Sequence, residues 1–197
     1  MGNLSGKSLW VMRHGRPDLP PNPFLMDREQ FNRFLNAYDD AGLSSLETDR
    51  LSALYRNFPE PDRVISSNLP RALKTATLYA RSRPIAVDPL FREIPVWLPD
   101  QPNWFLNRRW PGEMWWNYLR LHWFRDQEPE GRTLSLRRAE QAIALLKSHQ
   151  QDADRLAVVS HAGFLMVIIH LLQSRREIAG RRLPHINFGQ PTRYVWR

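Results

Sequence analysis

The sequence predicts an α/β fold, a three-layer sandwich with a mostly parallel central sheet flanked by helices. Short apolar runs that suit buried strands alternate with longer segments whose apolar residues recur at helical spacing. Polar clusters at residues 13–16, 66–71 and 160–163 each follow such a run, as expected where parallel strands end at a ligand site. The 197 residues, 42% of them hydrophobic, suit one domain with its own core.

The first half of the chain yields three expected strands and three expected helices. The strands are an apolar run at residues 9–12 and shorter runs at 63–66 and 84–87. Four prolines after the first strand keep the next segment extended and non-helical. The helices are expected at about residues 28–38, 45–57 and 70–80.

The third of these helices has a start signal. Pro70 suits the first turn of a helix, where the missing N–H of proline needs no partner. Three polar residues before Pro70 are candidates for the N-cap: Ser66, Ser67 and Asn68.

Residues 95–126 differ in composition from the rest of the chain. Six of the eight tryptophans fall there, namely Trp97, Trp104, Trp110, Trp115, Trp116 and Trp123. Prolines interrupt the first part of this segment, whereas residues 113–124 can form a helix. We expect a tryptophan-rich, helical lid that is inserted into a single domain spanning residues 1–197.

The C-terminal part returns to the alternating pattern. A helix with a wide apolar face is expected at about residues 134–150, followed by an entirely apolar strand at 156–159. An apolar helix at 164–172 and a last strand at 192–196 complete the expected elements.

Composition excludes several classes of site. The chain has no cysteine, so disulfides, thiolate nucleophiles, zinc fingers and iron–sulfur clusters are excluded. No apolar run approaches the roughly 20 residues that cross a bilayer, and the first residues do not resemble a signal peptide. A cytoplasmic location is therefore the expectation.

Positive charge is the main compositional bias. The net charge is +8, and only three of the 28 basic residues are lysines. Guanidinium groups bind phosphate bidentately, so this bias suits a phosphate-binding protein. A general bias on a solvated surface explains the overall charge better, but it does not account for arginines placed at strand ends.

Two histidines stand out by their positions. His14 and His161 each follow an apolar strand and lie beside a glycine or one residue from it, where side chains and amides can face a ligand. The competing interpretation is a zinc site in which Asp18 or Glu93 joins these histidines. We expect no metal, because the histidines lack ligand spacing and nearby arginines would repel a cation.

Four short segments together form a specific pattern. They are Arg13-His14-Gly15, SSNLPRALKTA from residue 66 to 76, LFREI from 90 to 94, and Ser160-His161-Ala162-Gly163. In this order they resemble the conserved blocks of the histidine phosphatase superfamily, the phosphoglycerate-mutase-like fold. A lone Arg-His-Gly would be weak, whereas four ordered segments that span most of the chain are specific.

The resemblance implies a metal-independent phosphatase that needs no cofactor and acts on a small-molecule phosphate ester. It implies that His14 accepts the phosphoryl group, that Arg13, Arg71 and His161 hold the phosphate, and that Glu93 protonates the leaving oxygen. A neutral imidazole attacks an anionic ester without charge repulsion. Neighbouring guanidiniums should lower the pKa of His14 and stabilise charge on the phosphoryl oxygens. Bound phosphate should favour the charged form of His161.

The first segment departs from the family pattern. The family usually continues Gly-Glu-Thr or Gly-Glu-Ser, whereas this chain has Arg16 and Pro17. Arg16 is either an additional phosphate ligand or a solvent-facing side chain. Ser66 and Ala162 are further candidates for substrate binding, although capping or packing suits Ser66 better. Asp18, close in sequence to the nucleophile, is the alternative acid.

In this family the region after the acidic residue often covers the active site and selects the substrate, and residues 95–126 occupy that place. An aromatic lid, with Trp97 as the candidate contact, would stack on a flat or apolar leaving group. For each single tryptophan, packing inside the protein is the better explanation. Arg108 and Arg109 are candidates for holding a second anionic group. We expect an organic phosphate with an aromatic or apolar portion.

Two other functions stay open at this point. A phosphoglycerate-mutase-type phosphotransferase is one, although the insertions that grip a phosphoglycerate carboxylate are not recognisable. The other is a non-catalytic module that binds a phospho-ligand or nucleic acid, because basic grooves with stacking aromatics bind single strands. No such motif is recognisable, so we expect no specific nucleic acid and no membrane partner; a homodimer stays open.

Overall fold

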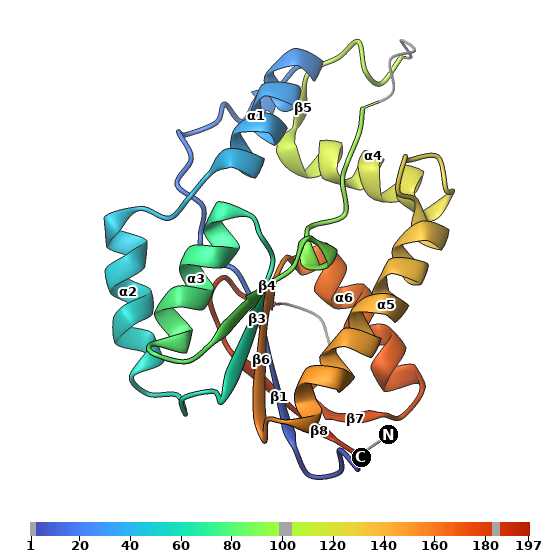
Figure 1. The fold of residues 1–197 in the computed structure, drawn as a ribbon. Helices are drawn as coiled ribbons and strands as arrows, with labels where there is room; N and C mark the ends of the chain where they lie inside the picture. The colour runs from blue at the N-terminus through green and yellow to red at the C-terminus, as the bar shows by residue number, and fades with distance from the viewer. Residues whose placement is uncertain (1–2, 99–103, 183–185) are drawn as a thin grey trace.

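The computed structural model describes residues 3–98, 104–182 and 186–197, which form a three-layer α/β arrangement (Figure 1). Within them, the central sheet has six strands in the order β4-β3-β6-β1-β8-β7. These strands are β1 (Ser8–Arg13), β3 (Arg63–Ser66), β4 (Ile85–Val87), β6 (Arg155–Ser160), β7 (Ile178–Gly180) and β8 (Thr192–Trp196).

The sheet is parallel over most of its width. Strand β1 pairs with β6, β6 with β3, and β3 with β4, all in parallel. Strand β8 is antiparallel to β1, and β7 is antiparallel to β8. The expected mostly parallel sheet is therefore confirmed. The short edge strand β7 was not expected, because three residues are too few to show a strand period.

Six α-helices are described, in three pairs: α1 (Arg28–Asp40) and α4 (Gly112–Phe124), α2 (Ser45–Tyr55) and α3 (Pro70–Ala80), and α5 (Arg132–Gln151) and α6 (Ala162–Ser174). Helices α5 and α6 cover one face of the sheet, and α2 and α3 cover the other (Figure 1). Helices α1 and α4 lie beyond the carboxyl ends of the parallel strands (Figure 1). None of the described helices is long and apolar enough to cross a membrane.

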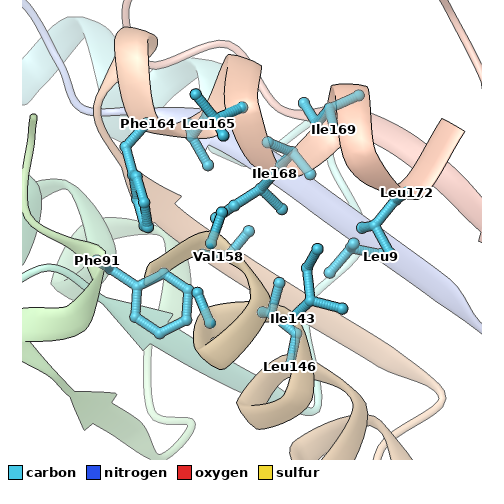
Figure 2. Close-up of a cluster of buried hydrophobic side chains, with 14 of the residues drawn as sticks. Leu9, Phe91, Ile143, Leu146, Val158, Phe164, Leu165, Ile168, Ile169 and Leu172 are labelled. Atoms are coloured by element: carbon cyan, nitrogen blue, oxygen red, sulfur yellow. The ribbon is translucent and has the colours of Figure 1, made fainter. Parts of the chain in front are cut away.

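Side-chain alternation along the strands divides the core in two. Leu9 and Val158 point to the face covered by α5 and α6, where Figure 2 shows them packed against Ile143 and Ile168. Met12, Ala157 and Val159 belong to the opposite cluster, under α2 and α3. Both faces are buried, as expected for a parallel sheet. The central strands are therefore held rigidly from both sides, and so are the loops at their ends.

The prediction of a polar N-cap residue for α3 is wrong. Leu69 occupies the N-cap position without a side-chain hydrogen bond, and Pro70 follows it at the start of the helix. The hydroxyl of Ser66 donates instead to the carbonyl of Ser67, 2.8 Å away. Two of the first amides need no side-chain cap, because Pro70 has no N–H and the amide of Ala72 donates to the carbonyl of Leu69 at 2.9 Å.

Most of the tryptophan-rich segment packs against α1, whereas Trp123 at the end of α4 packs against the core cluster under α5 and α6. A short strand pair, β2 (Leu25–Met26) with β5 (Trp110–Pro111), joins the two regions. A third cluster of buried side chains contains Phe31 of α1 together with Trp115 and Leu119 of α4. We call this unit, which consists of α1 and the described residues 95–98 and 104–126, the aromatic cover.

Candidate active site

Three strand ends bring the polar clusters to one edge of the sheet. Arg13 is in register with Ser160, and Ser66 with Val159, so β1, β3 and β6 end at the same level. The pairing continues past the strand end, because the amide of His14 donates to the carbonyl of Ser160 at 2.9 Å. The loops that carry the candidate residues therefore start side by side.

His14 has a buried and oriented imidazole ring. His14 is only 1% exposed, and its Nδ1 lies 2.7 Å from the carbonyl oxygen of Gly15. A carbonyl accepts only, so Nδ1 carries the proton and Nε2 keeps a free lone pair. Burial lowers the pKa of His14 to about 3, and the charges of Arg71 and Arg13 act in the same direction. The ring is therefore neutral, with Nε2 as the nucleophilic atom.

Gly15 gives the loop after His14 its tight path. Its amide donates to Oγ1 of Thr75 at 2.8 Å. A Cβ at this position would lie 2.6 Å from Cδ1 of Leu51, a buried core side chain of α2. Glycine is therefore required by the close packing of this loop on the core.

Arg71 joins the two histidines. Its side chain is completely buried; Nε lies 3.3 Å from Nε2 of His14, and Nη2 lies 3.4 Å from Nδ1 of His161. The Nε–Nη2 edge of a guanidinium carries two parallel N–H groups that fit a phosphate bidentately. Arg71 therefore presents this edge to the space beside the nucleophile.

His161 is the second buried ring of the site. Its ring centroid lies 4.9 Å from that of His14, and its Nε2 lies 2.9 Å from Oγ of Ser67. Burial, and after it the charges of His14, Arg71 and other neighbours, hold the pKa of His161 well below its usual range. The unliganded ring is therefore neutral. A bound phosphate would act on its pKa in the opposite direction.

Arg13 completes the positive side of the site. Its guanidinium carbon lies 3.5 Å from the ring centre of Phe188, and Nη2 donates to the hydroxyl of Tyr38 at 3.4 Å. The buried Nε atom of Arg13 has no hydrogen-bond acceptor among the described residues. A buried donor of this kind favours an anionic ligand at the site.

Glu93 lies at the N-terminus of α6. Its Oε1 accepts hydrogen bonds of 3.0 Å from the amides of Ile94 and Phe164, and Oε2 accepts one of 3.3 Å from Gly163. Burial raises the pKa of Glu93 above its usual range, against the opposing effect of these amides and of Arg13. Oε2, with one long hydrogen bond, is the oxygen better placed to carry a proton.

Gly163 allows the close approach of this carboxylate. A Cβ added to Gly163 would lie 2.8 Å from Oε1 of Glu93. Any larger residue here would displace the acidic side chain from the helix terminus.

Arg16 has its backbone in the site loop but an exposed side chain. Its amide donates to Oε1 of Glu47 at 2.8 Å, and Arg50 holds the same carboxylate through two hydrogen bonds of 2.7 Å. Glu47 therefore fixes the loop after the nucleophile, a role that no sequence motif indicated.

The remaining candidates lie around these groups. Ser66 is fully buried and bonds to backbone, and Ala162 is the first residue of α6. Asp18 is exposed, with its amide bonded to the carbonyl of Gly42 at 3.0 Å. Among the described residues, no group of three or more histidine, aspartate or glutamate side chains could hold a metal ion.

The candidates in the lid segment have different surroundings. Trp97 is 57% exposed, and its amide donates to Glu128 at 3.0 Å. Arg109 is also exposed and donates to the carbonyl of Leu25, 3.1 Å away. Arg108 is exposed at the turn that follows Phe105. None of these contacts joins the side chain to His14, Arg71 or His161.

Four contacting residues had not been predicted from the sequence as site residues. Tyr38 from α1 and Phe188, just before β8, flank Arg13, whereas Ser67 and Thr75 hold His161 and Gly15. Ser67 and Thr75 were within a recognised segment, so their positions carried a signal. Tyr38 and Phe188 carried none, because an aromatic residue in an amphipathic pattern is usually core.

Comparison with known proteins identifies the family. The family model of the histidine phosphatase superfamily (branch 1) matches residues 9–193. No curated protein sequence matches the chain significantly.

Several solved structures share the fold. A proposed alpha-ribazole-5'-P phosphatase from Escherichia coli K-12 aligns with a TM-score of 0.61 and 22% identity, over 97% of this chain and 95% of that one. The alpha-ribazole phosphatase from Shigella flexneri aligns with a TM-score of 0.56 and 18% identity, over 96% and 94%. A mycobacterial glucosyl-3-phosphoglycerate phosphatase in complex with VO3 gives 0.56 and 17%, over 97% and 96%. With a family match that covers nearly its whole length, the chain belongs to the histidine phosphatase superfamily.

Proposed function

We propose that the protein is a metal-independent phosphomonoesterase that works through a phosphohistidine at His14. The observation that carries this proposal is the geometry of the buried His14 ring: Nδ1 lies 2.7 Å from the carbonyl oxygen of Gly15, which leaves Nε2 to face Nε of Arg71 at 3.3 Å. The names of the similar structures describe phosphatases, which supports the same class of reaction.

In the first step, Nε2 of His14 attacks phosphorus. An N–P bond forms, the P–O bond to the leaving group breaks, and Glu93 gives its proton to the departing oxygen. Burial, by raising the pKa of Glu93, favours the protonated form that this step needs. Arg13, Arg71 and His161 stabilise the charge on the phosphoryl oxygens, so no metal ion is required.

In the second step, water attacks the phosphohistidine. Glu93, now a carboxylate, takes a proton from the water, the N–P bond breaks, and inorganic phosphate leaves with the neutral His14 ring restored. Because one carboxyl group alternates between acid and base, its raised pKa serves both steps.

For the substrate, we infer a small organic phosphate with an aromatic or apolar portion, selected by residues 95–126. The support is the aromatic content of this segment and the exposed rings of Trp97 and Trp104, 57% and 73% accessible. Equal turnover of small sugar phosphates and aryl phosphates would contradict this inference.

The direct test of the nucleophile is His14→Ala, assayed with 4-nitrophenyl phosphate in excess chelator. We expect a loss of turnover on the order of 10³-fold or more, since a covalent nucleophile is removed. The matched control is His170→Ala, because His170 is exposed on α6, and it should keep full activity. Full activity in His14→Ala would remove the central proposal.

A second test looks for the intermediate. A rapid quench in alkali during turnover should trap a mass increase of one phosphoryl group on the peptide that contains His14. Transfer of this group to a phosphoglycerate, instead of to water, would favour the mutase alternative.

A further inference from the structure

The last turn of α1 lies directly over the nucleophile. The hydroxyl oxygen of Tyr38, in this turn, is 3.5 Å from Nε2 of His14. The same oxygen accepts a hydrogen bond of 3.4 Å from Nη2 of Arg13. It therefore lies beside both the attacking nitrogen and a guanidinium, next to the space that a transferring phosphoryl group would enter.

Arg71 is attached to the same turn. Its Nη1 donates to the carbonyl oxygens of Tyr38 and Asp39, and Nη2 lies 3.4 Å from Oδ1 of Asp39. The last carbonyls of a helix have no partner within the helix, so a buried guanidinium satisfies them well. The guanidinium carbon also lies 4.5 Å from the centre of the Tyr38 ring. These contacts fix the far end of Arg71 and turn its Nε–Nη2 edge toward the histidines.

The hydrogen-bond donors around Nε2 of His14 indicate what Tyr38 does during the reaction. Because Nε2 of His14 is unprotonated, the O–H of Tyr38 and the Nε–H of Arg71 both point at its lone pair. When an N–P bond forms, this lone pair is consumed and both donors need a new acceptor. The nearest new acceptors are the oxygens on the phosphorus atom itself.

The loop after the nucleophile offers no comparable donor. The side chain of Arg16 is exposed, and Pro17 has no polar group. A hydroxyl group supplied by α1 is thus the neutral donor closest to the reacting nitrogen among the described side-chain contacts of His14.

We propose that Tyr38 is a catalytic residue whose hydroxyl donates a hydrogen bond to an oxygen of the phosphoryl group on His14. This inference rests on the proposed function and adds a ligand from α1 to the groups supplied by the sheet. It also makes the aromatic cover part of the phosphate site, because Tyr38 belongs to the helix that packs against Trp115.

The test is Tyr38→Phe, which keeps the ring against Arg71 and removes only the hydroxyl. Loss of one hydrogen bond to a charged group typically changes a rate or binding constant by about 10–100-fold. We expect kcat/KM for 4-nitrophenyl phosphate to fall by this factor and the Kd of inorganic phosphate, measured by calorimetry, to rise. The matched control is Tyr194→Phe in β8, whose hydroxyl donates to the carbonyl of Arg181 at 3.2 Å; it should match the wild type.

The outcomes separate the two proposals. Wild-type kcat/KM and phosphate affinity in Tyr38→Phe would overturn the role of Tyr38 while leaving the proposed function intact. A tighter phosphate complex would also overturn it, because Tyr38 would then only block the nucleophile. Turnover that survives His14→Ala in the same assay would remove the proposed function instead. Calorimetry tests Tyr38 even without turnover, and a wild type that binds no phosphate contradicts both proposals.

Discussion

The strand-end site and the aromatic cover both contain arginines and aromatic rings, but they hold them in different ways. In the site, charged side chains are buried among fixed partners, as Arg71 is between two histidines. In the cover, Trp115 is buried among aromatic rings, whereas Trp97 and Trp104 are exposed. Directional hydrogen bonds hold the side chains of the site, whereas ring packing holds the buried part of the cover. The buried, hydrogen-bonded charges are therefore in the first region and the exposed rings in the second, while Tyr38 of α1 contacts both.

The two regions are joined by a series of rings along α1. Trp115 stacks on Phe31 with centroids 5.2 Å apart, Phe31 lies 5.9 Å from Phe34, and Phe34 lies 5.8 Å from Tyr38. The ring of Tyr38 is in turn 6.1 Å from that of His14. These rings form a continuous series of contacts from Trp115 of the cover to the ring of His14.

After removal of the nucleophile, the largest expected effect on the site comes from Glu93→Gln. General acid help is typically worth about 10²–10⁴-fold, so turnover of alkyl phosphates should fall by that range. A good leaving group such as 4-nitrophenolate needs less protonation, and its reaction should lose much less. An equal loss for both substrates would show that Glu93 does not act as the acid, and Asp18→Asn would then be the next variant to measure.

Trp115→Ala tests whether the buried ring of Trp115 stabilises the aromatic cover. Removal of this fully buried ring, which also loses the 3.0 Å bond from Nε1 to the carbonyl of Met26, should cost about 3–5 kcal/mol of unfolding free energy. Trp104→Ala is the matched control, because its exposed ring should change stability by no more than about 0.5 kcal/mol. Denaturant unfolding measures both. Equal stability of the two variants would refute the packing role given to Trp115.

The buried histidines predict a pH dependence of stability. Burial lowers the pKa of His14 to about 3 and lowers that of His161, whereas in the unfolded chain both titrate near about 6.5. Below that pH the unfolded state binds more protons than the folded state, so stability is fully present above about pH 6.5 and is lost toward lower pH. The slope is up to about 1.4 kcal/mol per pH unit for each histidine.

His14→Gln should remove the contribution of one titrating group from the slope of unfolding free energy against pH. His170→Ala should leave the contribution of His14 in place. The raised pKa of Glu93 makes stability fall as the pH rises, opposite to the effect of the histidines. The quantity to measure is therefore the difference in slope between His14→Gln and wild type. Parallel curves of unfolding free energy against pH would contradict the buried, neutral His14.

The smallest expected effect is on selectivity. Trp97→Ala should lower kcat/KM for an aryl phosphate by a few-fold, up to about 10-fold, and leave a small sugar phosphate unchanged, because loss of one stacking contact is worth about 0.5–1.5 kcal/mol. The ratio of the two kcat/KM values is the measurement. An unchanged ratio in Trp97→Ala and also in Trp104→Ala would mean that these exposed rings do not meet the substrate.

The site was predictable from sequence where a residue directly follows a buried strand. His14 and His161 are fixed by β1 and β6, so the apolar runs before them already indicated one shared edge. Glu93 follows a 3₁₀ turn, η1 (Pro89–Phe91), and its place at the N-terminus of α6 depends on packing between distant segments. The N-cap of α3 was wrongly expected because local hydrogen bonding of Ser66 to backbone cannot be told from capping in the sequence.

The sequence by itself determined five of the six described strands of the central sheet, the residues at their ends, and through them the family, because apolar runs and polar strand ends are local properties of the chain. Only the tertiary structure decided which atom of His14 is free, that burial more than arginine charge lowers its pKa, and that α1 brings Tyr38 to the nucleophile. These features arise from contacts between segments far apart in the chain. Desolvation and hydrogen-bond direction follow from such contacts, and neither leaves a periodic pattern in the sequence.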